Sequence, residues 1–460
     1  MKPSGLFLLA AVSVCLAVAA PAATRPHYGG TVRLSIQESP ASLDPADSGQ
    51  PGMFPSPSLS HLIFDTLVTL DARGQAQAAL STAWQADPGN QRWQFNIRHG
   101  VTFHDGTPLT SDAVAASLRA ANPNWKVFAT GQAVVVECDA PTSNLPAVLA
   151  LPRYGIAKRG GGKLAGTGPF AINRWDPGKK LTLTARDDYW GGRTFADSIE
   201  IEMGKSLREQ MIALDLGKAE IVEVAPEQAG HAVLEGRRVE ISAPAEWMAL
   251  AFSHDIQSAE DGKLRGALAL SIDRESMNNV LLQGGGEPAG TLLPDWLTGY
   301  AFLFPTAVDL PRARQIRGEV HTVPVWTLGY DAADPLARVI AERIALNAGD
   351  AGLTLQPVAI QSKGSRLADV RLVRMPLSSL DARVALSELA SSLGLPQPRF
   401  DGDPAYSLYA AESALLQSQR VIPLLHLRTA TALSANVMGW QEDRDGSWRL
   451  QNVWLEMGKP

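Results

Sequence analysis

Residues 92–120, RWQFNIRHGVTFHDGTPLTSDAVAASLRA, constrain the fold of this chain more than any other segment. The first six alternate apolar and polar side chains, which is the period of a strand with one buried face. Residues 104–106, His-Asp-Gly, predict a turn, since glycine tolerates positive φ and aspartate bonds its own backbone. Residues 110–112 can cap a helix in which Val114 and Leu118 lie on one face. The segment therefore predicts a strand, a turn and a capped helix, in that order.

The length and composition indicate a large globular protein. A chain of 460 residues buries a sizeable core and should divide into more than one domain. Hydrophobic residues make up 45% and charged residues 19%, which argues against disorder. The net charge of −6, with no basic stretch, argues against binding to nucleic acid or to an anionic membrane surface. Core packing explains most of the 11 tryptophans, although aromatic residues also line ligand clefts.

The N-terminus has the three parts of a secretory leader. Lys2 is the positive region, residues 6–20 are apolar, and residues 20–22 form an A-x-A cleavage site. The apolar run is too short for a comfortable membrane span of ~20 residues. A lipid anchor at Cys15 is not expected, because Val14 stands where a lipobox needs a small residue. We therefore expect a cleaved signal peptide, the loss of Lys2 with it, and a periplasmic protein.

The sequence offers no recognisable catalytic or metal-binding constellation. The motifs HExxH, CxxC and GxSxG are all absent, and the histidines lack ligand spacing. His104-Asp105 could suggest a metal or phosphohydrolase site, but the surrounding pattern favours a turn. Cleavage of the leader would leave Cys138 as a single thiol in a strand-like setting, so a buried structural cysteine without a disulfide is expected. We predict neither an enzyme nor a bound cofactor or metal.

A glycine-rich joint, KRGGGK, occupies residues 158–163. Such a loop could cradle a phosphate, because its backbone N–H groups can bind anions. The spacing of a P-loop is absent, so a flexible crossover is the favoured interpretation.

Several motifs, taken in their order along the chain, resemble one protein family. They are GGTVRLSI (29–36), the segment at 92–120, GTGPF to YWGG (166–192), a helix–IDRE–helix segment (264–294), and VIPLLH (421–426). Together they are similar to the family 5 extracytoplasmic solute-binding proteins, the dipeptide, oligopeptide and nickel receptors of ABC importers. The resemblance is dense before Pro294 and sparse after it.

The resemblance implies an α/β fold of the type II periplasmic-binding-protein class, with two lobes joined by a hinge, mixed sheets and an extra small domain inserted in the first lobe. The implied boundaries are a signal peptide at 1–22; lobe I at 23–60, 163–245 and 428–460; the inserted small domain at 61–162; and lobe II at 246–427. Passages between the lobes are expected near residues 48–60, 158–168 and 243–246, where loop positions can absorb a hinge rotation.

The resemblance also implies a function. The protein would capture a short peptide or similar small molecule by closure of the two lobes and deliver it to the ABC permease subunits in the membrane, acting as a monomer. Closure requires that the ligand bind the closed form better than the open form. The segment at 377–393 is shorter than in the family, which leaves an alternative: a degenerate relative acting as a sensor or scaffold. A secreted hydrolase is disfavoured, because no nucleophile–base pair can be named.

Candidate ligand-binding residues are aromatic, sulfur-containing or charged side chains in segments that face the cleft in relatives. They are Trp247, Met248, Trp296, Tyr300, Arg371 and Arg374. The planar fork of an arginine could clamp a carboxylate. For each residue the alternative is a plain structural role, in the core for an aromatic residue and in solvent for an arginine.

Overall fold

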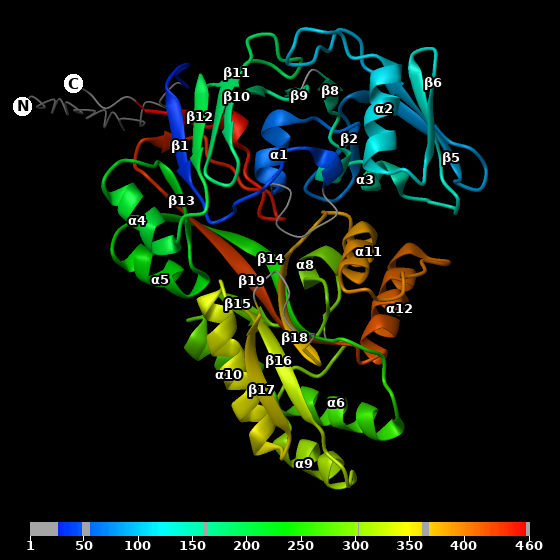
Figure 1. Ribbon diagram of the computed structural model, residues 1–460, viewed down its shortest axis with the longest axis vertical. Helices are drawn as coiled ribbons and strands as arrows, with labels where there is room; N and C mark the ends of the chain where they lie inside the picture. The colour runs from blue at the N-terminus through cyan, green and yellow to red at the C-terminus, as the bar shows by residue number, and fades with distance from the viewer. Residues whose placement is uncertain (1–25, 48–55, 161–162, 302, 361–367, 457–460) are drawn as a thin grey trace, which may run out of the picture.

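The computed structural model describes residues 26–47, 56–160, 163–301, 303–360 and 368–456 (Figure 1). A mixed sheet of 11 strands runs through the molecule in the order β10-β11-β12-β1-β13-β19-β14-β18-β16-β17, with β15 paired to β19. The mixed α/β class predicted from the sequence is therefore confirmed. The predicted signal peptide, residues 1–22, lies outside the described residues. Among the described residues, no helix is both long and apolar enough to cross a membrane.

Lobe I, as we use the term, is the part of the sheet that begins at β10 and ends at β13. Its elements are β1 (Thr31–Ser35), η1 (Pro45–Asp47), α1 (Pro57–Ile63), β10 (Phe170–Asp176), β11 (Lys180–Ala185), β12 (Ser198–Glu202), α4 (Leu207–Asp215), β13 (Ile221–Val224), α5 (Pro226–Leu234), β20 (Val437–Met438), η4 (Leu450–Asn452) and β21 (Trp454–Leu455). Val32, Leu34 and Ile36 are buried on one face of the sheet, as their alternation predicts. The other face is covered by α4 and α5.

Lobe II is built on β18, β16 and β17. Its elements are α6 (Ala259–Ser271), α7 (Arg274–Ser276), η3 (Met277–Leu281), β15 (Gly286–Pro288), α8 (Asp295–Thr298), α9 (Leu310–Gly318), β16 (Val325–Asp331), α10 (Pro335–Asp350), β17 (Thr354–Ile360), β18 (Val370–Pro376), α11 (Ala382–Ser392) and α12 (Pro404–Gln417). Helices α6, α9 and α10 pack against the core on one face of the sheet, and α8, α11 and α12 pack against the core on the other.

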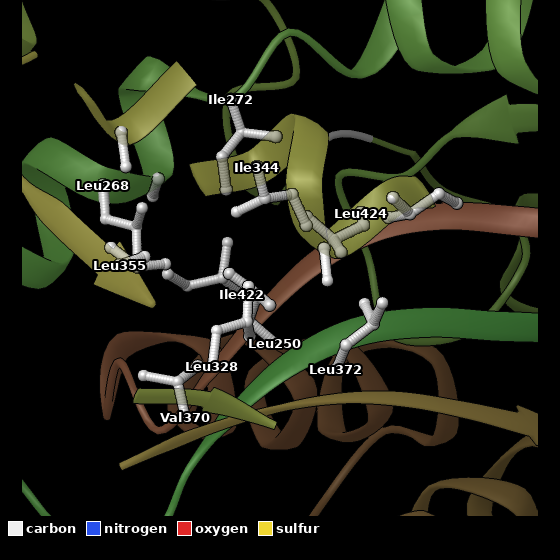
Figure 2. Packing of buried hydrophobic residues seen from close by; sticks show 14 of the residues in the cluster. Leu250, Leu268, Ile272, Leu328, Ile344, Leu355, Val370, Leu372, Ile422 and Leu424 are labelled. Carbon is white, nitrogen blue, oxygen red and sulfur yellow. The ribbon is translucent and has the colours of Figure 1, made fainter. Parts of the chain in front are cut away.

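Two hydrophobic cores hold lobe II together, one on each face of its sheet. In the first, Leu250, Leu328 and Ile422 from the strands meet Leu268 and Ile344 from the helices (Figure 2). On α10, Ile340 and Ile344 are fully buried, but Val339 is 44% exposed. It lies one residue before Ile340, and on a helix of 3.6 residues per turn only the Ile340 side of that pair faces the sheet. The second core contains the apolar faces of α11 and α12.

Two long strands, β14 (Arg238–Phe252) and β19 (Val421–Leu433), pass through both lobes and pair with each other along their length. We call this pair the hinge ribbon. Near β13 it belongs to lobe I, and near β18 it belongs to lobe II. The pairing slips between Ile241 and Pro244 and again between Pro244 and Glu246. Such irregularities bend and twist a strand locally, so the lobes meet where the ribbon is least regular.

The small domain is built on the sheet β4-β5-β7-β6. Its elements are β2 (Val68–Leu70), β3 (Ala76–Ala78), β4 (Ser81–Ala86), β5 (Arg92–Ile97), α2 (Ser111–Ala121), β6 (Lys126–Thr130), β7 (Ala133–Glu137), α3 (Leu145–Val148) and η2 (Pro152–Tyr154). The predicted strand, turn and capped helix are confirmed: Gly106 has φ +79°, and the Thr110 hydroxyl accepts a hydrogen bond from Ala113 N at 3.2 Å. Cys138 is buried, as predicted.

The glycine-rich joint differs from the prediction. β8 (Lys158–Gly160) and β9 (Lys163–Ala165) pair as an antiparallel hairpin, with residues 161–162 outside the described part of the chain. The next strand, β10, belongs to lobe I, so the predicted passage between the lobes at 158–168 is wrong. The passage predicted at 243–246 is correct, because it lies in β14. Of the passage predicted at 48–60, residues 48–55 lie outside the described residues. The residue boundaries of the domains stay a prediction.

Candidate functional site

Charged side chains from both lobes gather beside the hinge ribbon, and we call this group the carboxylate cluster. Lobe I contributes Glu38, just after β1, and Glu223 on β13; the ribbon contributes Glu246; lobe II contributes Asp334 and Arg374. The Arg374 guanidinium donates from Nε to Glu246 Oε2 at 2.6 Å and from Nη1 to Asp334 Oδ2 at 3.5 Å. The charges of Glu246 and Arg374 both act on Glu223, and the charge of Glu223 acts on Glu38.

The lobe II part of the cluster is fixed by regular local structure. Strands β14 and β18 are antiparallel neighbours, with Met248 opposite Arg374, so Arg374 reaches Glu246 on the same sheet face two residues away. Asp334 caps α10 by accepting hydrogen bonds from Leu336 N at 2.9 Å and Ala337 N at 3.2 Å. Its second oxygen stays free to face Arg374. Arg374 thus ties the ribbon to the N-terminus of α10.

The lobe I part of the cluster consists of carboxylates held by amide groups. Glu223 accepts hydrogen bonds from Gln37 N at 2.6 Å and from Gln210 Nε2 at 3.0 Å. Glu38 accepts one from Ser56 N at 3.1 Å. Loss of solvent raises the pKa of Glu223, and it raises the pKa of Glu38 to about 7, chiefly because the charged form loses hydration. A cationic or hydrogen-bond-donating group placed here would stabilise both ionised carboxylates.

The structure uses the predicted site residues in different ways. Arg374 belongs to the carboxylate cluster. Trp247 and Met248 are buried on opposite faces of β14, in the two cores of lobe II, with 4% and 1% exposure. Arg371 is exposed on β18, three residues from Arg374. The six predicted residues are therefore not brought together in one place.

Trp296 and Tyr300 both make contacts within the protein. The Trp296 indole donates from Nε1 to Pro244 O of the hinge ribbon at 2.9 Å, and the Arg444 guanidinium lies 5.7 Å from the centre of its ring. The Tyr300 hydroxyl donates to Oε2 of the fully buried Glu412 at 2.6 Å. Burial raises the pKa of Glu412. A ligand-binding role for either aromatic residue stays a prediction.

Sequence reasoning missed four members of the cluster: Glu38, Glu223, Glu246 and Asp334. Only Asp334 carried a local signal, because an aspartate before a proline at the first helical position is typical of a helix start. The other three occur in unremarkable strand and loop sequences and approach one another only through the sheet order.

Two cavities lie away from the carboxylate cluster. One, of about 140 Å³, lies between α5 of lobe I, the loop at 283–285 of lobe II and the hinge ribbon. The other, of about 210 Å³, lies at an edge of the small domain beside Arg92, Lys126 and Cys138. Within the described ranges, no group of three or more His, Cys, Asp and Glu side chains could hold a metal ion.

Comparison with known proteins places the fold and the sequence in one family. Residues 75–385 match the family model described as bacterial extracellular solute-binding proteins, family 5 Middle. In sequence, the chain is 23% identical to the glutathione-binding protein GsiB of Shigella dysenteriae over 98% of this chain and 99% of that protein. It is 36% identical to the uncharacterized protein YhjP of Bacillus subtilis over 163 residues.

Some relatives match over only part of their length. The aligned region covers 28% of YhjP and 48% of the probable D,D-dipeptide-binding periplasmic protein DdpA of Escherichia coli, which is 22% identical. DdpA and GsiB are both named as binding proteins, and neither is named as an enzyme.

Solved structures agree on the fold. The DppA protein of Helicobacter pylori in complex with the peptide STSA superposes with a TM-score of 0.79 at 17% identity, covering 94% of this chain and 99% of that one. NikA of Staphylococcus aureus in complex with Ni(L-His)2 gives 0.78 at 15% identity, covering 93% and 100%. The predicted type II periplasmic-binding-protein fold is thereby confirmed. With this fold, and with the family model matching residues 75–385, the chain belongs to the bacterial extracellular solute-binding proteins, family 5.

Proposed function

We propose that this protein is the extracytoplasmic substrate-binding component of an ABC importer. It captures a short peptide or similar small molecule between its lobes and delivers it to the permease subunits in the membrane. The observation that carries the proposal is the carboxylate cluster at the hinge ribbon, to which both lobes of a family 5 fold contribute. A ligand that contacts both lobes there binds the closed form better than the open form, which is the condition for closure.

The chemistry of the cluster favours a ligand with an ammonium group. The cluster contains four carboxylates and one guanidinium, so its ionised form carries more negative than positive charge. A free peptide amino terminus would supply the missing positive charge and several N–H donors. Arg371, which is exposed on the opposite face of β18 from Arg374, is a separate proposed contact for a ligand carboxylate. Of the other predicted residues, Trp296 and Tyr300 pack against the second core of lobe II, on the sheet face opposite Arg374, and they remain proposed contacts.

The proposal extends to location and assembly. A cleaved leader would place the protein in the periplasm, and a monomer would present both lobes to the permease. The relatives that bind glutathione, the peptide STSA and a nickel–histidine complex support a small solute as cargo, with a peptide as our choice.

The test is calorimetry and thermal unfolding with an equimolar pool of di- and tripeptides, and with the same pool N-acetylated. We expect the free peptides to raise the unfolding temperature and the acetylated pool to bind at least about tenfold more weakly, as loss of a charge-assisted pair requires. The variant Glu246→Gln should weaken binding of the free pool, whereas Glu342→Gln, on the exposed side of α10, should not.

Native mass spectrometry of the purified protein gives an independent result. A copurified peptide or other amine would support the proposal. Protein that emerges empty, and shows no thermal shift with either pool, would contradict it and favour the scaffold alternative.

A further inference from the structure

Helix α11 has two buried faces, and they belong to different parts of the molecule. Ala385, Leu386 and Leu389 lie in the second core of lobe II. Val384 instead joins the hydrophobic core of the small domain, with 4% exposure. Asp381, Val384 and Glu388 are spaced three and four residues apart, so they share one face of the helix and present it to the small domain.

Polar contacts flank Val384 on this face. The Arg153 guanidinium forms a two-pronged ion pair with Glu388, in which Nη2 donates to Oε1 at 2.5 Å. Both side chains are half-buried, with 31% and 24% exposure. At the other end, Asn144 Nδ2 donates to Asp381 Oδ2 at 2.5 Å. Arg153 and Asn144 both belong to the small domain, which immobilises them on η2 and at the start of α3.

The backbone makes a further close approach beside these contacts. Gly74, in the turn between β2 and β3, has φ +72°, and a Cβ atom there would clash with the Leu380 carbonyl oxygen. The loop that precedes α11 is therefore packed directly against a turn of the small domain. Gly74, Asn144, Arg153 and the face of α11 together form one continuous contact.

The small domain is in turn fixed to lobe I. His104 N donates to Gly166 O at 2.9 Å, and the buried Arg186, which follows β11, donates from Nη1 to Thr102 O at 3.0 Å. Asp65 accepts hydrogen bonds from Tyr189 and Trp190 at 2.9 and 2.8 Å. Because the small domain moves with lobe I, its contact with α11 is a second bridge between the lobes, separate from the hinge ribbon.

We propose that the α11 contact is a latch that holds the two lobes together through protein residues alone, and that its release limits the opening of the solute site. For the lobes to open, the Arg153–Glu388 ion pair and the Asn144–Asp381 hydrogen bond must break, and Val384 must leave the core of the small domain, all at once. The segment at 377–393, which contains α11, thus acquires a mechanical role. The proposal shares with the proposed function only the premise that the lobes part, and its test needs no solute.

The experiment is small-angle X-ray scattering of the protein without added peptide, in Glu388→Ala, Asn144→Ala and the charge-swapped pair Arg153→Glu with Glu388→Arg. We expect the two alanine variants to have a larger radius of gyration than the wild type, with the open population raised about tenfold. The swapped pair should return toward the wild-type value. Far-UV circular dichroism checks that each variant is folded.

The matched control is Glu342→Ala, which removes an ion pair of 2.9 Å that lies within α10 and crosses no boundary. Its radius of gyration should equal that of the wild type. Wild-type scattering curves from folded Glu388→Ala or folded Asn144→Ala would overturn the latch, because the lobes would then be held without these contacts. Binding of the peptide pool by the same variants reports separately on the proposed function.

Discussion

The hinge ribbon and the α11 latch connect the same two lobes by different physical means. In the ribbon, β14 and β19 pair along their backbones, and each strand continues covalently from one lobe into the other. In the latch, side chains of α11 contact side chains of the small domain, and no backbone segment connects the two at this point. A backbone ladder can bend at its irregular positions without losing its hydrogen bonds, whereas side-chain pairs across a surface break when the two surfaces separate. The hinge ribbon therefore determines how the lobes can move relative to each other, and the latch determines the free energy needed to separate them.

The carboxylate cluster lies beside the ribbon and includes one of its residues, Glu246. Its members are fixed by strand register and by a helix cap, so they keep their places within each lobe as the lobes move. Only the distance between the Glu38–Glu223 part and the Glu246–Arg374 part depends on the hinge. This arrangement suits a site whose two halves are assembled by closure.

The largest effect that would distinguish the latch from the hinge ribbon is the loss of stability expected in Gly74→Ala. The left-handed backbone and the clash with Leu380 O should together cost about 2 to 4 kcal/mol of unfolding free energy and push α11 away. Denaturant unfolding and scattering measure both results. Gly89→Ala is the control, since Gly89 also has positive φ, +101°, but nothing within 4 Å of the added carbon. Equal losses in the two variants would mean that no latch contact is affected.

The next largest loss of stability is expected beside the hinge ribbon, from Arg374→Gln. Removal of the guanidinium leaves Glu246 and Asp334 without their cationic partner, which should cost about 2 kcal/mol. Because the charge of Arg374 lowers the pKa of Glu223, that pKa should rise further in the variant. The loss of stability should therefore grow as the pH rises. Arg338→Gln, which breaks an exposed pair within α10, should leave the free energy of unfolding nearly unchanged. A loss as large as in Arg374→Gln would refute this account.

A smaller effect is expected from Trp296→Phe, which keeps a ring but removes the donor to Pro244 O. One hydrogen bond at the irregular part of the ribbon should contribute about 1 kcal/mol. We also expect a larger scattering radius, because Trp296 fastens α8 of lobe II to the ribbon. Trp84→Phe, in the small domain, controls for the general loss of an indole. A Trp296→Phe protein with unchanged unfolding and scattering would show that the ribbon bends independently of this bond.

The last prediction concerns a change in pH dependence in Glu38→Gln, and not a loss of stability at one pH. The folded pKa of Glu38, about 7, lies above the ordinary value of 4.5, so the folded state binds this proton more tightly than the unfolded chain. The contribution to stability is present below about pH 4.5 and is lost as the pH rises toward 7. The wild type should therefore lose stability relative to Glu38→Gln across this window, in thermal unfolding at several pH values. Parallel curves for the two proteins would contradict the raised pKa.

Local patterns in the sequence were sufficient for many elements. Alternation in residues 92–97 predicted β5, and residues 110–112 predicted the cap of α2, where Thr110 accepts a hydrogen bond from Ala113 N. These features depend on neighbours a few residues away, so single-chain periodicity reports them faithfully. The hairpin at 158–165 was not foreseen, because glycines permit both a crossover and a turn. The inserted small domain was predicted from the family resemblance, which rests on the order of the motifs along the chain.

Sequence by itself determined much of the strand and helix pattern, the lack of a basic stretch and the family resemblance, since all three reside in composition and local spacing. Tertiary structure alone decided which charges meet. Glu38, Glu223, Glu246, Asp334 and Arg374 are separated by up to 336 positions in the chain and become neighbours through sheet order. It also decided that α11 presents its second face to the small domain. A contact between distant segments depends on the whole chain's packing, which no local pattern encodes.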